Sequence, residues 1–257
     1  MAHQNKIVAD REQFVVKAND LIQRTRYNLT TQQQKIVLYA ISKIRPNDTV
    51  DTEYEFSIEE ICAACGLKTE NGGYYYMSIK SDIKKLTERQ WCVMPDGKES
   101  TVSWIGDATI VPGSGTVRIS FHKKMAPYLF ELREKYTQYK LLNVLAFKGK
   151  YTIRLYEILR SHITQRMIDK DKESSFLVSV EELRDLLMVK SYPRWADFDR
   201  FIIKKAVEEI NLFADDIHIE YEAVKKDGKT VSSVAFFIEA ARAKQQFLAH
   251  QERRKRL

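Results

Sequence analysis

Two arginines and two lysines lie close together in the second half of the chain, and their types suit contacts to nucleic acid. An arginine guanidinium can donate two parallel hydrogen bonds to O6 and N7 of guanine, whereas a lysine ammonium is a point charge that suits a phosphate. We therefore expect Arg194 and Arg200 to read base edges, and Lys204 and Lys205 to contact phosphates. The candidate binding residues of this half are Tyr192, Arg194, Asp197, Arg200, Lys204, Lys205, Lys225, Lys226 and Lys229.

The segment that carries most of these side chains has the periodicity of an amphipathic helix from about Trp195 to Phe213. Its expected apolar face consists of Phe198, Phe201, Ile202, Ala206 and Ile210. The opposite stripe consists of Asp197, Arg200, Lys204 and Glu208. An ordinary solvated helix face, with pairing of Asp199 to Arg200 and of Glu208 to Lys204, remains open as an alternative for any one of these residues.

A hairpin is predicted directly after this helix. Residues Ile217 to Val224 alternate apolar and polar side chains, Lys226 to Lys229 form a turn signal, and Val231 to Ile238 return. Lys225, Lys226 and Lys229 therefore lie at the hairpin tip, where they can contact a phosphate backbone or serve solubility alone.

A weak internal repeat links this region to the first half of the chain. Phe56 to Ile61 recurs as Val178 to Leu183, and each copy predicts a short helix capped by a serine, Ser57 or Ser179. A helix with a Leu-Tyr pair precedes each copy, at Lys35–Ile41 and Ile153–Leu159. A longer amphipathic helix follows each copy, the first from about Tyr75 to Gln90.

The first of these long helices supplies a second candidate set. Its members are Tyr74, Ser78, Ser81, Lys84 and Lys85. Hairpin strands are expected after it at Trp91–Met94, Thr101–Ile105 and Val117–Phe121. We expect the first half to be the weaker reader, because its long helix has no arginine before Arg89, and we expect Tyr76 to face the core.

The order of helix, short helix, long helix and hairpin is that of a winged helix-turn-helix, and it occurs twice. The sequence therefore predicts an α+β protein of two tandem winged helix-turn-helix domains, covering residues 1–134 and 135–257. In such a domain the second helix of the helix-turn-helix enters the major groove of DNA.

Several patterns that resemble enzyme or metal sites have simpler interpretations. Cys62-Ala63-Ala64-Cys65 lacks the second pair that a zinc site needs, and we expect it to fill the core. Asp227-Gly228-Lys229-Thr230 lacks the upstream glycine of a phosphate loop. The five histidines include no pair two residues apart, which a metal-dependent nickase would need. We expect no catalytic residue, no metal and no cofactor.

Composition narrows the class of protein further. The chain has 257 residues, 44% of them hydrophobic, and its three cysteines favour a reducing compartment. Its longest apolar runs are too short to span a membrane, and we expect a cytoplasmic protein. The formal charge is +7, but Arg242 to Leu257 alone carry +5. That basic tail is either a solvated end or an arm that contacts phosphate.

Three stretches resemble a known family. They are Val15–Ile22, Tyr136–Lys140 continuing to Arg154–Leu159, and Phe198 through Ile210 with its Glu208-Glu209-Ile210-Asn211 ending. Together they resemble the Rep initiators of theta-replicating, iteron-bearing plasmids. The resemblance implies two winged-helix domains that bind repeated double-stranded sites at an origin, open the adjacent DNA and help to recruit the host replicative helicase and initiator proteins. It also implies a homodimer in equilibrium with monomer, paired through the N-terminal domain, that represses its own promoter.

Two other functions remain open at this point. The first is a winged-helix transcription repressor without a role in replication. The second is a metal-dependent rolling-circle nickase.

Overall fold

The computed structural model describes residues 14–67, 72–88, 90–93, 98–111, 113–132, 135–163, 167, 173–226, 228 and 230–240. The chain divides into two compact units, Met1–Ala146 (unit 1) and Phe147–Leu257 (unit 2). The division falls after Ala146 rather than after residue 134, because strand β7 (Tyr136–Lys140) pairs antiparallel with β1 (Phe14–Ala18) near the start of the chain. Residues 135–146 therefore complete unit 1.

Unit 1 contains a winged helix-turn-helix in the predicted order. Its elements are α3 (Thr31–Ile41), β2 (Tyr54–Ser57), α4 (Ile58–Ala64), α5 (Gly72–Thr87), β5 (Ile105–Val111) and β6 (Thr116–Phe121). A separate two-stranded sheet of β3 (Gln90–Val93) and β4 (Glu99–Val102) is inserted after α5. The remaining elements are α2 (Asn19–Gln23), η2 (Lys123–Met125), α6 (Ala126–Leu129) and α7 (Leu141–Leu145).

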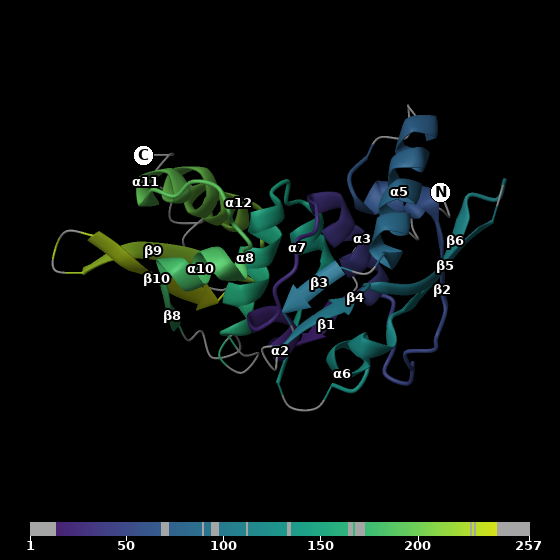
Figure 1. Cartoon of the computed structure of the whole chain (residues 1–257), viewed down its shortest axis with the longest axis horizontal. Coiled ribbons are helices and arrows are strands. Elements are labelled where there is room, and N and C mark those ends of the chain that lie inside the picture. Colours follow the sequence, from purple (N-terminus) through teal and green to yellow (C-terminus); the bar gives the residue numbers. More distant parts are fainter. Residues whose placement is uncertain are drawn as a thin grey trace, which may run out of the picture. The chain divides into compact units, whose positions relative to one another are not determined.

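Unit 2 repeats the same order with a longer hairpin. Its elements are α8 (Lys150–Ser161), β8 (Ser174–Ser179), α10 (Val180–Leu186), α11 (Trp195–Phe198), the π-helical turn η3 (Asp199–Ile203), α12 (Lys204–Phe213), β9 (Ile217–Lys226) and β10 (Thr230–Ala240). Figure 1 shows the hairpin of β9 and β10 extending beyond the helices of unit 2.

The two sheets have the same topology, which confirms the repeat. In unit 1 the strand order is β2-β6-β5, and in unit 2 it is β8-β10-β9. In each unit the strand before the short helix therefore pairs antiparallel with the second strand of the hairpin. The predicted fold class, two tandem winged-helix domains of mixed helix and strand, is confirmed.

Serine caps fix where the short helices begin. The Ser57 hydroxyl accepts a hydrogen bond from the Glu60 amide at 3.0 Å, and the Glu60 carboxylate accepts one from the Ser57 amide at 3.0 Å. The Ser179 hydroxyl likewise accepts from the Glu182 amide at 3.0 Å. Each cap satisfies amides that have no partner inside the helix, typically at a gain of about 1 kcal/mol.

Each unit buries its own apolar core beneath its long helix. In unit 1, Ile79, Ile83 and Leu86 of α5 are buried, as are Val117 and Phe121 of β6. The core of unit 2 includes Tyr156, Leu183, Phe198, Ile210, Val234, Phe236 and Ile238. Such side chains supply most of the favourable free energy of folding, at about 1.5–3 kcal/mol each. Among the described helices, none is long and apolar enough to cross a membrane.

Candidate nucleic-acid interface

The long helix of unit 2 runs through α11, η3 and α12, and its buried face departs from a plain α-helical pattern. Phe198, Ile202 and Ile210 are buried as expected, but Ile203 is also fully buried and Phe201 is 37% exposed. The assignment of Phe201 to the apolar face was wrong. The π-helical turn at Asp199–Ile203 adds a residue to one turn, and this changes which side chains face the core.

The basic side chains that the sequence singled out are exposed along this helix. Arg194 precedes α11 and its side chain is 88% exposed, and Arg200, Lys204 and Lys205 are also exposed. Asp197 is half-buried, and its carboxylate lies 3.9 Å from Nε of Arg194, a weak ion pair at this exposure. The structure therefore presents a guanidinium at the start of the helix and three further cations along its exposed side.

The loop before the helix is held by an arginine of α10 that sequence reasoning missed. Arg184 donates hydrogen bonds to the backbone carbonyls of Ser191 at 3.1 Å, Tyr192 and Pro193 at 3.4 Å. Its guanidinium carbon also lies 4.1 Å from the centroid of the Phe198 ring. Arg184 thus fixes the turn of the helix-turn-helix and, through it, the place where Arg194 emerges.

Tyr192 is exposed and has a left-handed backbone conformation, with φ of 59°. Its ring stacks on Phe201 at 5.0 Å between centroids and 27° between planes. Arg200 and Lys205 approach the Phe201 ring at 5.3 Å and 5.5 Å from its centroid. Two half-exposed aromatic rings and two cations therefore form one cluster on the exposed side of the helix.

The sequence left open a pairing of Asp199 with Arg200, but in the structure Asp199 has a different partner. Its carboxylate accepts a hydrogen bond from the Tyr221 hydroxyl of β9 at 2.7 Å. Burial, followed by this hydrogen bond to Asp199, raises the pKa of Tyr221 above its usual value of 10, so the phenol remains a donor at neutral pH. Asp199 thus links the helix to the hairpin instead of neutralising Arg200.

The hairpin has a second link to the helix. The side-chain amide of Asn211 donates to the Ile219 carbonyl at 2.8 Å and accepts from the Ile219 amide at 2.8 Å. Beyond this anchor, Lys225 and Lys226 are exposed at the end of β9, and Gly228 has φ of 70° in the turn. Lys229 lies outside the described residues. A wing with exposed lysines is therefore fixed to the helix at two points.

The corresponding helix in unit 1, α5, carries a different exposed face. Tyr74 is 75% exposed, and Ser81, Lys84 and Lys85 are exposed as expected. The Lys85 ammonium lies 3.9 Å from a carboxylate oxygen of Asp82. Met77, 62% exposed, and Lys80 share this face but were not in the predicted set.

Ser78 is the one predicted residue of α5 whose hydroxyl already has a protein partner. It accepts a hydrogen bond from the Gln32 side chain of α3 at 3.0 Å, and nearby Gln33 donates to Asp82 at 3.0 Å. These two bonds tie α5 to α3. We therefore assign Ser78 a positioning role rather than base contact. Tyr76, expected in the core, is only half-buried.

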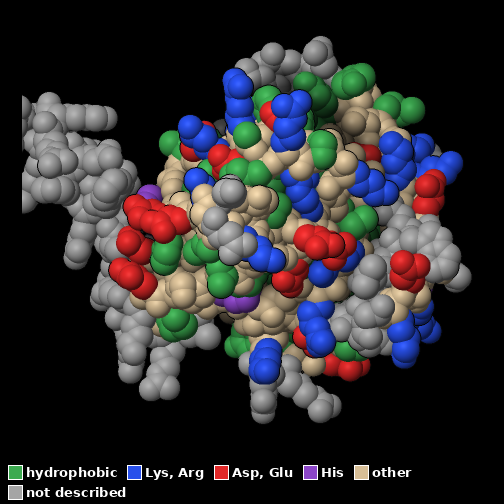
Figure 2. All heavy atoms as spheres, turned by 60° about the vertical axis from the view of Figure 1, so that its left-hand side comes forward, with side chains coloured by type: hydrophobic (Ala, Val, Ile, Leu, Met, Phe, Trp, Pro, Cys, Tyr) green, Lys and Arg blue, Asp and Glu red, His purple; other side chains and the backbone are tan. Residues whose placement is uncertain are grey.

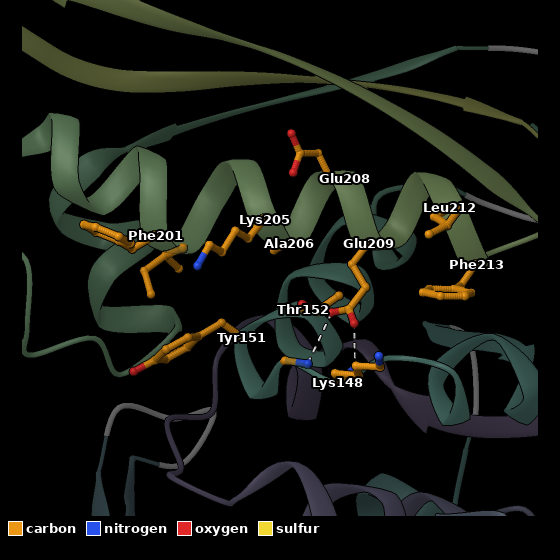
Figure 3. A pocket seen from close by; sticks show the side chains of 12 residues that line it. Lys148, Tyr151, Thr152, Phe201, Lys205, Ala206, Glu208, Glu209, Leu212 and Phe213 are labelled. Carbon is orange, nitrogen blue, oxygen red and sulfur yellow. Dashed lines mark hydrogen bonds between the residues drawn. The ribbon is translucent and has the colours of Figure 1, made fainter. Parts of the chain in front are cut away.

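A groove of about 570 Å³ borders the exposed side of α12 within unit 2 (Figure 3). Its lining includes Phe201, Lys205, Leu212, Tyr151 and Lys148. Figure 3 shows Glu208 directed away from the start of α8, whereas Glu209 reaches it. The Glu209 carboxylate accepts hydrogen bonds from the Lys148 amide at 2.6 Å and the Gly149 amide at 3.2 Å. Glu209 is thus a structural cap for the helix α8.

A buried ion pair anchors α8 to the segment before the wing. The Asp216 carboxylate accepts hydrogen bonds from Arg160 Nε at 2.9 Å and from the Tyr156 hydroxyl at 2.9 Å. Burial raises the pKa of Asp216, and the Arg160 charge opposes that shift. This network fixes where β9 begins.

The cysteine pair fills the core, as expected. Cys62 and Cys65 are buried free thiols, and burial raises the pKa of Cys65 to about 12. Within the described ranges, no group of three or more His, Cys, Asp or Glu side chains is arranged to hold a metal ion. The face drawn in Figure 2 carries lysine and arginine side chains in its upper part, at its centre and along its lower edge, with small groups of acidic side chains between them.

Comparison with known proteins places the chain in a family. The family model "Initiator Replication protein, WH1" matches residues 14–160, and "Initiator Rep protein, WH2" matches residues 179–238. A replication initiation protein of Escherichia coli is 25% identical over 237 residues, which cover 90% of this chain and 71% of the relative. The PI protein of Escherichia coli is 24% identical over 148 residues, which cover 52% of this chain and 46% of the relative.

A solved structure shares the fold over almost the whole chain. The Pi initiator protein, solved in complex with iteron DNA, matches with a TM-score of 0.73 and 18% identity, covering 90% of this chain and 98% of that one. At this identity the likeness concerns the fold. The family models span most of the chain and contain one winged helix each, but the first model extends to residue 160 and so takes in most of α8, which the structure places in unit 2. This chain therefore belongs to the family of plasmid Rep initiators, the initiator replication proteins with tandem winged-helix domains.

Proposed function

We propose that this replication initiator binds repeated double-stranded sites, iterons, at a plasmid origin and converts binding energy into opening of the adjacent DNA. The observation that carries the proposal is the exposed row of Arg194, Arg200, Lys204 and Lys205 on a helix that is fixed to a lysine-bearing wing. The Pi initiator, whose fold this chain shares, was solved with iteron DNA, which supports the same class of ligand.

Unit 2 is the main reader in this proposal. Its helix enters the major groove, where Arg194 and Arg200 donate to guanine O6 and N7 and each good contact contributes about 1–3 kcal/mol of discrimination. Lys204, Lys205, Lys225, Lys226 and Lys229 contact phosphates, which fixes the register of the helix on the duplex. Asp197 orients Arg194 across the 3.9 Å gap between them.

Unit 1 is an auxiliary reader and the site of dimerisation. Tyr74, Ser81, Lys84 and Lys85 of α5 contact the sugar–phosphate backbone, with Ser78 holding the helix on α3. Binding of one unit raises the effective concentration of DNA at the other, so that the pair binds more tightly than either alone. A dimer in equilibrium with the monomer represses the chain's own promoter.

Origin opening follows from bound monomers that deform the duplex. Bending a site of 20–30 base pairs costs about 1–6 kcal/mol, which several specific contacts can supply. The host replicative helicase and host initiator proteins then enter the opened DNA. In this proposal the protein acts in the cytoplasm and performs no covalent chemistry.

Replication of a plasmid that lacks every other initiator tests the proposal. The full-length chain supplied with its origin should sustain the plasmid, and Arg200→Ala should lose it. Glu222→Ala, an exposed acid on β9, should behave as the unaltered protein. Repression of the chain's own promoter without plasmid maintenance would favour the repressor instead. Nicking of supercoiled origin DNA in the presence of manganese, if it depends on a tyrosine, would overturn the assignment of no enzymatic activity.

A further inference from the structure

Phe201 is an apolar side chain on a surface that it shares with the Tyr192 ring and several cations. It is 37% exposed although Phe198, Ile202 and Ile203, which lie around it on the same helix, are buried. Its neighbours Arg200, Lys204 and Lys205 are all exposed. Burial in the core therefore does not account for a phenyl ring at this position.

The exposed ring is also held in place. Tyr192 stacks on it at 5.0 Å, and Tyr192 is fixed by its left-handed backbone and by the hydrogen bond from Arg184 to its carbonyl. A non-glycine residue with positive φ costs free energy and persists only where its surroundings impose it, and such residues cluster at functional sites. Single π-helical turns inside α-helices are also frequent at functional sites, and one of them brings Phe201 to the surface. The ring is thus pre-organised for contact with a ligand.

Double-stranded DNA offers such a ring one apolar group in the major groove. The C5 methyl of thymine is the only apolar feature among the base edges there, and phenylalanine is one of the side chains that contact it. The cations beside the ring match the negative charge of the DNA, so both parts of the cluster suit one ligand.

We propose that Phe201 makes an apolar contact to a thymine methyl group and is a specificity-determining residue, with Tyr192 as its positioning residue. This inference rests on the proposed function, since it assumes that the helix of unit 2 reads a repeated duplex site. It adds an A·T-specific contact to the guanine contacts of Arg194 and Arg200.

Replacement of thymine by deoxyuridine removes only the methyl group and tests the contact directly. Each thymine in the repeat protected by the full-length protein is replaced in turn, and affinity is measured by fluorescence anisotropy at fixed salt. The unaltered protein should lose about fourfold in affinity at one or two positions, the value of one buried methyl group. Phe201→Ala should bind the unmodified repeat about fourfold less tightly and lose its sensitivity to deoxyuridine at those positions.

Three further variants separate base contact from a structural role. Phe201→Leu, which keeps an apolar side chain, should retain part of the deoxyuridine effect. Tyr192→Ala should weaken that effect, and Leu212→Ala, 70% exposed on the same helix, should leave it unchanged. The salt dependence of binding should stay the same in Phe201→Ala, because the phenyl ring neutralises no phosphate.

Three contrary results have different meanings. Equal binding of the unaltered protein to thymine and deoxyuridine repeats at every position would overturn the contact while leaving repeat binding intact. The same deoxyuridine profile in Phe201→Ala and the unaltered protein would assign the methyl contact to another residue and overturn the role of Phe201. Failure of the unaltered protein to protect any repeat would overturn both this inference and the proposed function.

Discussion

The exposed faces of α5 in unit 1 and of α11 to α12 in unit 2 occupy the same place in a repeated fold but differ in their side chains. The face in unit 2 offers two arginines and an aromatic stack, and the face in unit 1 offers Tyr74, Met77 and lysines. An arginine fork discriminates between bases, whereas lysines bind phosphate without regard to sequence. We therefore propose that one fold serves two different tasks through a few exposed positions.

The two helices also differ in what holds them. Hydrogen bonds from Gln32 and Gln33 of α3 hold α5. The helix of unit 2 is bonded to its wing through Asp199 and Asn211, and Glu209 also bonds it to the start of α8. The helix of unit 2 is therefore fixed relative to its wing, which in the proposed function lets both contact one DNA site in a fixed register.

The largest effect is expected on stability, from the two buried carboxylates that anchor these regions. Asp216→Ala leaves Arg160 buried without its counter-ion and should lower the free energy of unfolding of unit 2 by about 3 kcal/mol. Asp82→Ala removes a carboxylate that accepts from the neutral Gln33 amide, and should cost unit 1 about 1.5 kcal/mol. Urea unfolding, monitored by amide hydrogen exchange in each unit, measures both losses of unfolding free energy. Glu222→Ala is the control. Equal losses would remove this difference between the units.

The next effect concerns DNA specificity. Arg200→Ala should cost about 1–3 kcal/mol on the specific repeat and little on random DNA, because it removes a base contact. Lys84→Ala in unit 1 should weaken binding to both DNAs alike. Competition binding on the two DNAs distinguishes these outcomes. A loss in Arg200→Ala that is equal on both would make this arginine a phosphate contact and erase the proposed contrast.

Removal of both wing lysines tests whether the wing lies on the backbone. The double variant Lys225→Ala and Lys226→Ala should reduce the slope of log affinity against log salt concentration by about 0.9 for each phosphate that these lysines neutralise. Binding titrations at several salt concentrations measure the slope. A slope that does not change would mean that these exposed lysines serve solubility.

The basic C-terminal tail, which lies outside the described residues, offers a similar test. Deletion of Arg253 to Leu257 should also flatten the salt dependence, by about 0.9 for each phosphate that the tail neutralises. The wing variant serves as the positive control in the same titration. A tail that is only a solvated end would leave the slope where it is.

The smallest effect is a pH dependence in unit 2. Burial lowers the pKa of His162, whose ring stacks on Phe176 at 4.0 Å. As pH falls below about 6.5 the unfolded chain binds this proton before the folded chain does, so stability present above that pH is lost. His162→Phe keeps the stack and should show a smaller loss of unfolding free energy between about pH 7.5 and about pH 5.5. Identical losses would show that other groups set the pH dependence.

Local signals in the sequence were sufficient for most of the fold. Ser57 and Ser179 cap their helices as predicted, and the hairpin after Ile217 forms, because caps and turns depend on residues that are neighbours in the chain. The boundary between units was placed too early. It depends on the pairing of β1 with β7, two strands far apart in sequence.

The sequence was sufficient to predict the charged residues of the candidate site, but not the contacts that hold the site in place. The exposure of Arg200 and Lys204 follows from helical spacing. The exposure of Phe201 depends on a π-helical turn, which spacing by four does not reveal. The bond between Ser78 and Gln32 is likewise a tertiary contact that no local pattern indicates.

Iteron binding by unit 2 is best tested by footprinting of the full-length protein on the DNA that flanks its own gene, at physiological salt. We predict protection of several direct repeats spaced by about two helical turns, with Arg200→Ala abolishing it and Lys84→Ala only weakening it. Protection of a single inverted repeat over a promoter, or salt-sensitive binding with no protected site, would contradict iteron binding.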